Sequence, residues 1–274
     1  MGDYSALKLR MYDMSVKEAK DLVVGDKLMG FDGEARTVTE VSCNTGPCFR
    51  YRGCNVGKDY VMSLRTTKDI KDSLGREFES GAACNISVED YLACKPEVRA
   101  SLKSWYGVLR LESKDVDTSK YVEPYIMGLI LMNEEFCANR HINRRIPDRY
   151  LYSTPDDKLA LLAGMIESQD YFSSEADDVG LLVKGEGLID DIVMLAGSMG
   201  YSGRIDESED EYYIVTIRGN ISKIPLYAKY PETSDVVLDE VEVEAVEEGE
   251  YYSVVVKEDN KLVLSSDFVV CYAN

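Results

Sequence analysis

The sequence predicts an α+β protein in which a mostly-β domain is interrupted by a smaller α+β insert. Short alternating segments separated by turns fill the chain up to about Lys114 and return near its end. Between them, apolar residues recur at helical spacing. We therefore expect a β domain made of residues 1–115 and 232–274, and an insert made of residues 116–231.

The first part of the β domain has recognisable turn and cap signals. The dipeptides Asp32-Gly33 and Val56-Gly57 fall between alternating apolar and polar stretches, which is where hairpin turns belong. A helix is expected after Ser87, because "SVEDYL" places a serine at the cap position and a carboxylate three residues later.

The middle and the end of the chain follow the two expected periodicities. Apolar spacing predicts three helices, in "PYIMGLILMNEEF", "DDKLALLAGMIESQDYF" and "GLIDDIVMLAGSMGY". Residues Tyr212 to Arg218 are expected to form a strand. The acidic stretch "VVLDEVEVEAV" alternates as a strand with one wet face would. The last residues predict a pair of strands around Asp259-Asn260.

Charge and cysteine content narrow the functional classes. The net charge of −19 repels nucleic-acid phosphates and acidic membrane surfaces, so it disfavours a general nucleic-acid binder. The 7 cysteines show no C-x-x-C spacing, which favours reduced thiols in the cytoplasm. The apolar run "YIMGLILM" is too short to cross a bilayer. We expect neither a membrane association nor a cofactor.

Several segments, in order, resemble an intein that carries a homing endonuclease. "AKDLVVGDKLMGFDGEARTVTEV" resembles the opening of a Hint domain, the self-splicing fold of inteins. "EEGEYYSVVVKEDNKLVLSSDFVVCYAN" resembles its closing strands. Between them, "YIMGLILMNEE" and "LLAGMIESQD" resemble the two motif helices of a LAGLIDADG endonuclease. The resemblance implies a Hint-like β domain interrupted by a reduced LAGLIDADG-type insert.

The positions that carry splicing in the intein family hold inert residues in this sequence. The resemblance places Gly2 at the nucleophile, Thr66 near the core histidine and Ala273 before the terminal Asn274. Glycine has no side chain with which to attack. The sequence contains 1 histidine, His141, and it lies in the insert. We therefore expect no splicing activity.

The endonuclease positions have changed in a similar way. The family uses one carboxylate at the foot of each motif helix to hold divalent metal ions, and the match places Asn133 and Gln169 there. Neutral amides lack the negative charge that a hard cation requires. One alternative is that Glu134 and Asp170, one residue later, took over as ligands, although that step turns a helical side chain by about 100°. Glu167 is expected to be a packing or capping residue.

The insert is also short and acidic. Too few residues separate Glu135 from "RRIP" to form a complete half-sheet, so most of the first DNA-binding sheet is expected to be missing. Residues 121–230 contain 10 Lys and Arg against 19 Asp and Glu, a net charge of −9. The exception is a basic cluster made of Arg140, Arg144, Arg145 and Arg149, with His141 among them. We expect this cluster either to bind a phosphate or another acidic partner, or to pair with the protein's own acidic side chains.

Three hypotheses follow from these residues. The favoured one is a non-catalytic protein-interaction or adaptor factor that was domesticated from an intein with its endonuclease, with an origin in a phage or virus suggested by association. Its partners would be other proteins. The second is a DNA-binding protein without cleavage activity that uses the remaining half-sheet and the arginine cluster. The third is a divergent metal-dependent nuclease that uses Glu134 and Asp170.

Overall fold

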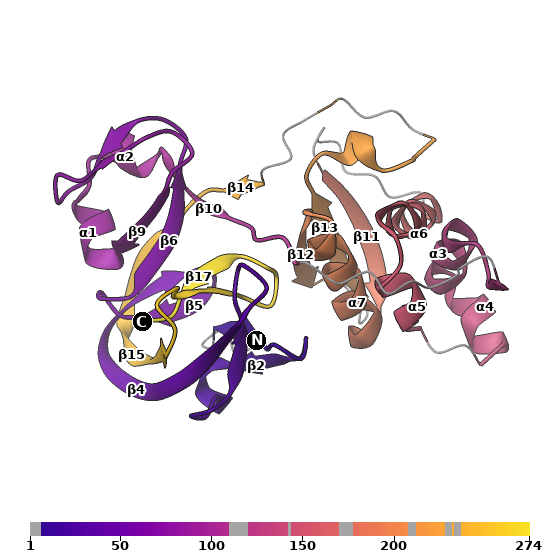
Figure 1. Ribbon diagram of the computed structural model, residues 1–274, viewed down its shortest axis with the longest axis horizontal. Coiled ribbons are helices and arrows are strands. Elements are labelled where there is room, and N and C mark those ends of the chain that lie inside the picture. Colours follow the sequence, from indigo (N-terminus) through magenta and orange to yellow (C-terminus); the bar gives the residue numbers. More distant parts are fainter. Residues whose placement is uncertain are drawn as a thin grey trace. The chain divides into compact units, whose positions relative to one another are not determined.

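The computed structural model describes residues 7–109, 120–141, 144–169, 178–207, 212–227, 232 and 237–274 (Figure 1). Helices and strands are mixed, so the α+β class is confirmed at this level. The chain divides into two compact units. The outer unit consists of Met1–Gly107 and Leu238–Asn274, and the central unit of Val108–Val237. None of the helices in the described ranges combines the length and apolarity that a membrane span requires.

A long two-stranded ribbon is the main feature of the outer unit (Figure 1). Strand β4 (Ala35–Tyr51) pairs antiparallel with β15 (Val243–Val256), so residues about 200 positions apart become neighbours. A bulge after Val246 interrupts the register. Two short strands extend the ribbon on the side of β4: β3 (Lys27–Met29) and β5 (Cys54–Val56).

A second sheet of the outer unit has the strand order β14-β10-β6-β9. Its members are β6 (Val61–Thr66), β9 (Ala83–Ser87), β10 (Leu102–Trp105) and β14 (Leu238–Asp239). Strand β10 ends just before the chain leaves the outer unit, and β14 begins as it returns. Because Trp105 pairs with Leu238, the points where the chain leaves the outer unit and returns to it lie side by side.

Short elements complete the outer unit. The sheet pairs are β1 with β2, β7 with β8, and β16 with β17. Two apolar cores result: one centres on Leu9, Leu28 and Val263, and the other on Leu64 and Leu102. The remaining bounds are β1 (Lys8–Arg10), β2 (Val16–Glu18), β7 (Ile70–Lys71), β8 (Glu77–Phe78), β16 (Leu262–Leu264), β17 (Val270–Tyr272), α1 (Val88–Ala93) and α2 (Pro96–Arg99).

The central unit contains an antiparallel sheet of order β11-β13-β12 and several helices, of which α6 and α7 contact the sheet (Figure 1). Valines and leucines at alternate positions of β11 are buried, which gives the sheet its core face. The bounds are β11 (Asp178–Lys184), β12 (Ser202–Glu207), β13 (Tyr212–Arg218), α3 (Pro124–Met132), α4 (Glu134–Asn139), α5 (Asp148–Leu151), α6 (Pro155–Glu167) and α7 (Glu186–Ser198).

Helices α3 and α6 pack backbone to backbone through glycines. A Cβ atom on Gly128 would lie 2.3 Å from the carbonyl oxygen of Leu161, and one on Gly164 would lie 2.0 Å from that of Tyr125. Neither position can accept a side chain without separating the helices. The contact is reciprocal, because the glycine of each helix meets the carbonyl oxygen that lies three residues before the glycine of the other helix.

Several local predictions are confirmed and others are wrong. Ser87 caps α1 by accepting a hydrogen bond from the Asp90 backbone N–H, and Gly33 turns the chain between β3 and β4 with φ of 85°. The hairpin predicted at Val56-Gly57 is wrong, because β5 pairs with β4 across a turn at Arg52-Gly53. The strand pair predicted around Asp259-Asn260 is also wrong: β15 pairs with β4, and β16 pairs with β17.

Candidate functional site

Asn133, the first of the amides at the endonuclease positions, joins two helices. It ends α3 and caps the N-terminus of α4, where its Oδ1 accepts a hydrogen bond of 2.8 Å from the backbone N–H of Phe136. This bond satisfies a donor that the first turn of a helix leaves without an intrahelical partner. The amide oxygen of Asn133 therefore has a structural role.

Gln169, the second amide, binds the edge of the central sheet. Its Nε2 donates a 2.6 Å hydrogen bond to the carbonyl oxygen of Leu182, and its Oε1 accepts a 2.8 Å hydrogen bond from the Leu182 backbone N–H. Leu182 lies in β11, an edge strand of that sheet. Both functional groups of the amide are used, and a carboxylate could satisfy only one of these two backbone groups.

The neighbouring acids have partners of their own. Glu134 lies 3.2 Å from the Arg144 guanidinium and accepts a 3.2 Å hydrogen bond from the Tyr212 hydroxyl. Asp170, proposed as its counterpart, lies outside the described residues. Glu167 accepts a 2.8 Å hydrogen bond from the Tyr125 hydroxyl, and this bond raises the pKa of Tyr125 to about 12.

Two arginines of the basic cluster pair with acidic side chains of the central unit. Arg144 donates hydrogen bonds to the carbonyl oxygens of Leu131 (3.2 Å) and Lys184 (3.0 Å), in addition to its contact with Glu134. Arg145 forms a bidentate pair with Asp191, with both distances 2.7 Å. Only 2% of the Asp191 side chain is exposed, and the hydrogen bond to this carboxylate raises the pKa of Arg145.

The other two arginines of the cluster stack on aromatic rings. Arg140 lies over Phe136, with its guanidinium carbon 5.8 Å from the ring centroid. The guanidinium carbon of Arg149 lies over the rings of Tyr121 and Tyr150, 4.5 and 5.1 Å from their centroids. His141, the residue between Arg140 and the rest of the cluster, is exposed and has a positive φ of 53°.

The positions related to splicing lie in the outer unit. Thr66 is buried, and its hydroxyl donates a 2.6 Å hydrogen bond to the carbonyl oxygen of Glu79. Ala273 is buried and bonds through its backbone N–H to Lys261. The carbonyl oxygen of Asn274 accepts a 2.9 Å hydrogen bond from the backbone N–H of Val256. Gly2 lies outside the described residues.

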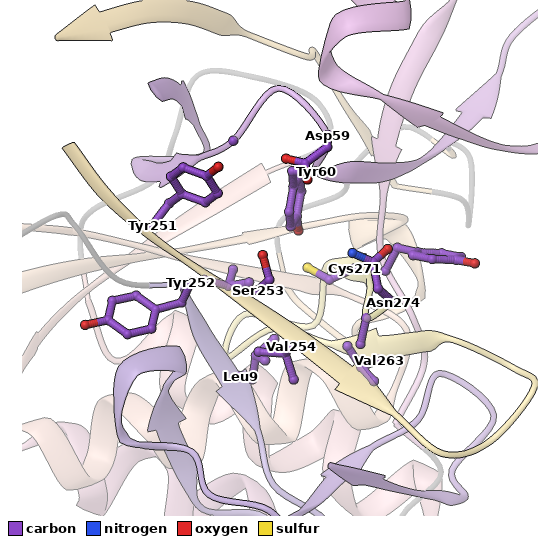
Figure 2. Close-up of a pocket in the computed structure, with 14 residues that line it drawn as sticks. Leu9, Asp59, Tyr60, Tyr251, Tyr252, Ser253, Val254, Val263, Cys271 and Asn274 are labelled. Atoms are coloured by element: carbon purple, nitrogen blue, oxygen red, sulfur yellow. The ribbon is translucent and has the colours of Figure 1, made fainter. Parts of the chain in front are cut away.

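A small cavity lies beside Asn274 (Figure 2). Figure 2 shows Tyr251, Tyr252 and Ser253 entering from β15, with Tyr60, Cys271 and Asn274 around the same space. The room open to water is about 20 Å³, which is enough for a single molecule. Thr66 is not among the residues that line this cavity, so the structure does not bring it to Asn274 there.

Cys271 and Ser253 are side chains of nucleophilic types that border this cavity, and the thiol of Cys271 is the stronger candidate by type. Burial, together with the nearby Asp267 carboxylate, raises the pKa of the Cys271 thiol to about 12. The thiol therefore stays protonated at neutral pH, and a protonated thiol is a poor nucleophile. Tyr60, which hydrogen-bonds to this sulfur, also has a raised pKa, chiefly because it is buried.

Metal-binding groups and known relatives give no further assignment. In the described ranges, His, Cys, Asp and Glu side chains do not form a group of three that could hold a metal ion. A comparison of the sequence with known protein families and with curated proteins found no match.

The sequence predicted pairing with the protein's own acids as one role of the arginine cluster, and the structure shows it for Arg144 and Arg145, but the sequence did not identify the partners. Asp191 has a readable signal, because it stands among Leu188, Ile192 and Leu195 in an otherwise apolar helix pattern. A carboxylate in such a position needs a buried cation as its partner. Tyr121 and Tyr150, whose rings both contact Arg149, carry no comparable signal in the sequence, because they are 29 positions apart.

Proposed function

We propose that this chain is a non-catalytic protein-interaction factor, built on a scaffold that resembles an intein with a reduced LAGLIDADG endonuclease insert. The observation that carries the proposal is the pair of hydrogen bonds between Gln169 and the backbone of Leu182. The side chain that would need to be a metal-binding carboxylate is an amide whose two ends are both used by the fold. Asn133 supports the same conclusion as a helix cap.

The charges of the central unit favour protein partners over nucleic acid. Glu134 and Asp191 pair with Arg144 and Arg145, so the charge of half of the basic cluster is already neutralised within the protein. The whole chain carries a net charge of −19, and a duplex approaching it meets a repulsive field. A protein surface is not subject to this general repulsion.

The proposal is tested by finding and rebuilding a complex. The full chain would be captured with crosslinking from the cells that produce it, and each recovered protein would be purified and titrated against the purified chain. We expect at least one protein to bind with micromolar or tighter affinity. If no protein recovered in this way binds the purified chain, the proposal is wrong.

Two assays separate the proposal from the DNA-binding and nuclease alternatives. Mobility shifts with duplex DNA at low and high salt should show no complex, whereas true phosphate contacts would give binding that weakens steeply with salt. Plasmid DNA incubated with Mg²⁺ or Mn²⁺ should remain intact. Cleavage by the wild type that disappears in a Glu134→Gln, Asp170→Asn variant would establish the nuclease alternative instead.

A further inference from the structure

Arg149 stacks on aromatic rings and has no anionic partner among the residues that the structure describes. Its guanidinium lies over the ring of Tyr121 and over that of Tyr150, and its buried Nε atom has no hydrogen-bond acceptor in the described part of the chain. The Tyr150 hydroxyl donates a 2.6 Å hydrogen bond to the Val122 carbonyl oxygen, which fixes the segment that carries Tyr121. A stacked guanidinium keeps its planar edge free for a carboxylate or phosphate.

Apolar side chains are exposed next to this arginine. Tyr121 is 52% exposed, Val122 40% and Ile126 41%. Tyr121 contacts Arg149 directly, Val122 follows it in the sequence, and Ile126 lies in the first turn of α3, which begins at Pro124. We call Tyr121, Val122, Ile126 and Arg149 the Tyr121–Arg149 patch. Tyrosine and arginine beside aliphatic residues are typical of interface centres.

Because α3 and α6 pack reciprocally, each residue of α3 has a counterpart on α6, and the exposure of Ile126 can be compared with that of its counterpart. Gly128 and Gly164 are 36 positions apart, as are Tyr125 and Leu161, so Ile126 corresponds to Leu162. Leu162 is completely buried, and α6 contacts both β11 and α7. Ile126 is therefore an exposed apolar side chain at the position equivalent to Leu162, which is buried in the other helix.

We propose that the Tyr121–Arg149 patch docks a segment of a partner protein that presents a carboxylate next to an apolar side chain. The carboxylate would pair with the two terminal Nη atoms of Arg149, because its Nε atom is buried, and the apolar side chain would cover Ile126 and Val122. This inference rests on the proposed function and names the surface and the partner chemistry. A second copy of the chain is disfavoured, because it would bring another charge of −19.

The direct test uses random peptides displayed on phage and selected on the full-length protein. We expect the selected peptides to combine Asp, Glu or a free C-terminal carboxylate with Leu, Ile or an aromatic residue. Their binding should weaken by about tenfold or more in Arg149→Met, Arg149→Lys and Tyr121→Ala. Arg149→Lys keeps the charge but loses the planar fork, so it isolates the bidentate contact.

Two matched variants control for a general loss of charge or aromatic surface. Arg204→Met removes an exposed arginine elsewhere in the central unit, and Tyr227→Ala removes a tyrosine that is 87% exposed. Both should bind the peptides as the wild type does. Circular dichroism of each variant establishes whether it is folded. If Arg149→Met does not fold, Tyr121→Ala still tests the patch, because it changes an exposed side chain.

Four outcomes would overturn this inference. The first is a selection that yields no peptide dependent on the patch, and the second is peptides that lack any carboxylate. The third is a duplex DNA complex that requires Arg149, since this would assign the patch to phosphates. A cellular partner that binds wild type and Tyr121→Ala, Arg149→Met equally would overturn the patch and leave the proposed function intact.

Discussion

Gln169 illustrates how a single side chain can decide between a structural and a catalytic role. Its amide donates to and accepts from the same backbone residue, Leu182. Asn133 differs, because its described contact uses only the amide oxygen. The two positions look equivalent in the sequence, but they differ in whether a carboxylate could replace the amide.

Replacing Gln169 with Glu should destabilise the protein by about 1–2 kcal/mol, because a hydrogen bond is lost and a carboxylate faces the Leu182 carbonyl oxygen. The unfavourable contact raises the pKa of the new carboxyl. The cost is therefore present at neutral pH and should be lost as the pH falls and the carboxyl is protonated. Chemical denaturation of the variant and the wild type at pH 7 and at about pH 4 gives the difference in free energy of unfolding at each pH.

Asn133→Asp is the matched control for this prediction, because the carboxylate keeps the acceptor that caps α4. Its stability should stay within about 0.5 kcal/mol of the wild type. Equal losses in the two variants would show that the second hydrogen bond of Gln169 does not matter.

Lys158 is a buried lysine in α6, and burial lowers its pKa below the ordinary value of 10.5. The unfolded state therefore binds more protons than the folded state between the two pKa values, so stability from this group rises as the pH approaches 10.5. Lys158→Met should stabilise the protein at pH 7 by about 1 kcal/mol, and less at pH 10. Thermal unfolding of both proteins at the two pH values provides the comparison. A gain that does not shrink at high pH would exclude charge burial as its cause.

Residue-level prediction from the sequence succeeded where the chemistry is local. The Ser87 cap depends on residues three positions apart, and the structure has it. The amide substitutions at Asn133 and Gln169 are visible in the sequence, but their hydrogen bonds are not. Leu182 is 13 positions from Gln169 and belongs to a strand that the periodicity did not indicate.

At the scale of elements, the pairing of α3 and α6 depends on two glycines. Gly128→Ala and Gly164→Ala should each destabilise the central unit by about 2–4 kcal/mol, since the new methyl group meets backbone atoms at 2.3 and 2.0 Å. Urea unfolding followed by circular dichroism measures this loss. Gly46→Ala in β4 is the control, because its methyl group would meet no atom within 4 Å. If the three variants were equally stable, the glycines would not set the approach of the helices.

Element prediction was strongest for long periodic segments and weakest for pairing. The strand expected at Tyr212–Arg218 is β13 within the same limits. The helix expected from Pro124 to Phe136 breaks at Asn133, because the side chain of that residue starts a new helix. The final strands were paired wrongly, because β15 finds its partner in β4, far away in the sequence, and local turn signals carry no information about such pairing.

At the scale of the whole molecule, the outer unit is interrupted where two of its own strands meet. Trp105 and Leu238 are cross-strand neighbours in the sheet that contains β10 and β14. Replacing residues 108–237 with a short glycine-rich loop should therefore leave the outer unit folded, because a hairpin connection can span paired strands. We expect a protein with strand-rich circular dichroism and a cooperative unfolding transition. A chain that stays unfolded in this form would mean that the outer unit depends on the central one.

The distant pairing of β4 with β15 also sets an order of events during synthesis. Tyr51 leaves the ribosome long before Val243, its partner in the ribbon, has been translated. The central unit, by contrast, is one continuous stretch and can complete its sheet as soon as β13 emerges. The nascent chain must therefore keep the edge of β4 that later binds β15 unpaired while its middle folds, although β3 and β5 can already pair with β4. Loop closure over such a separation is slow, so the ribbon is expected to be the last part of the protein to form.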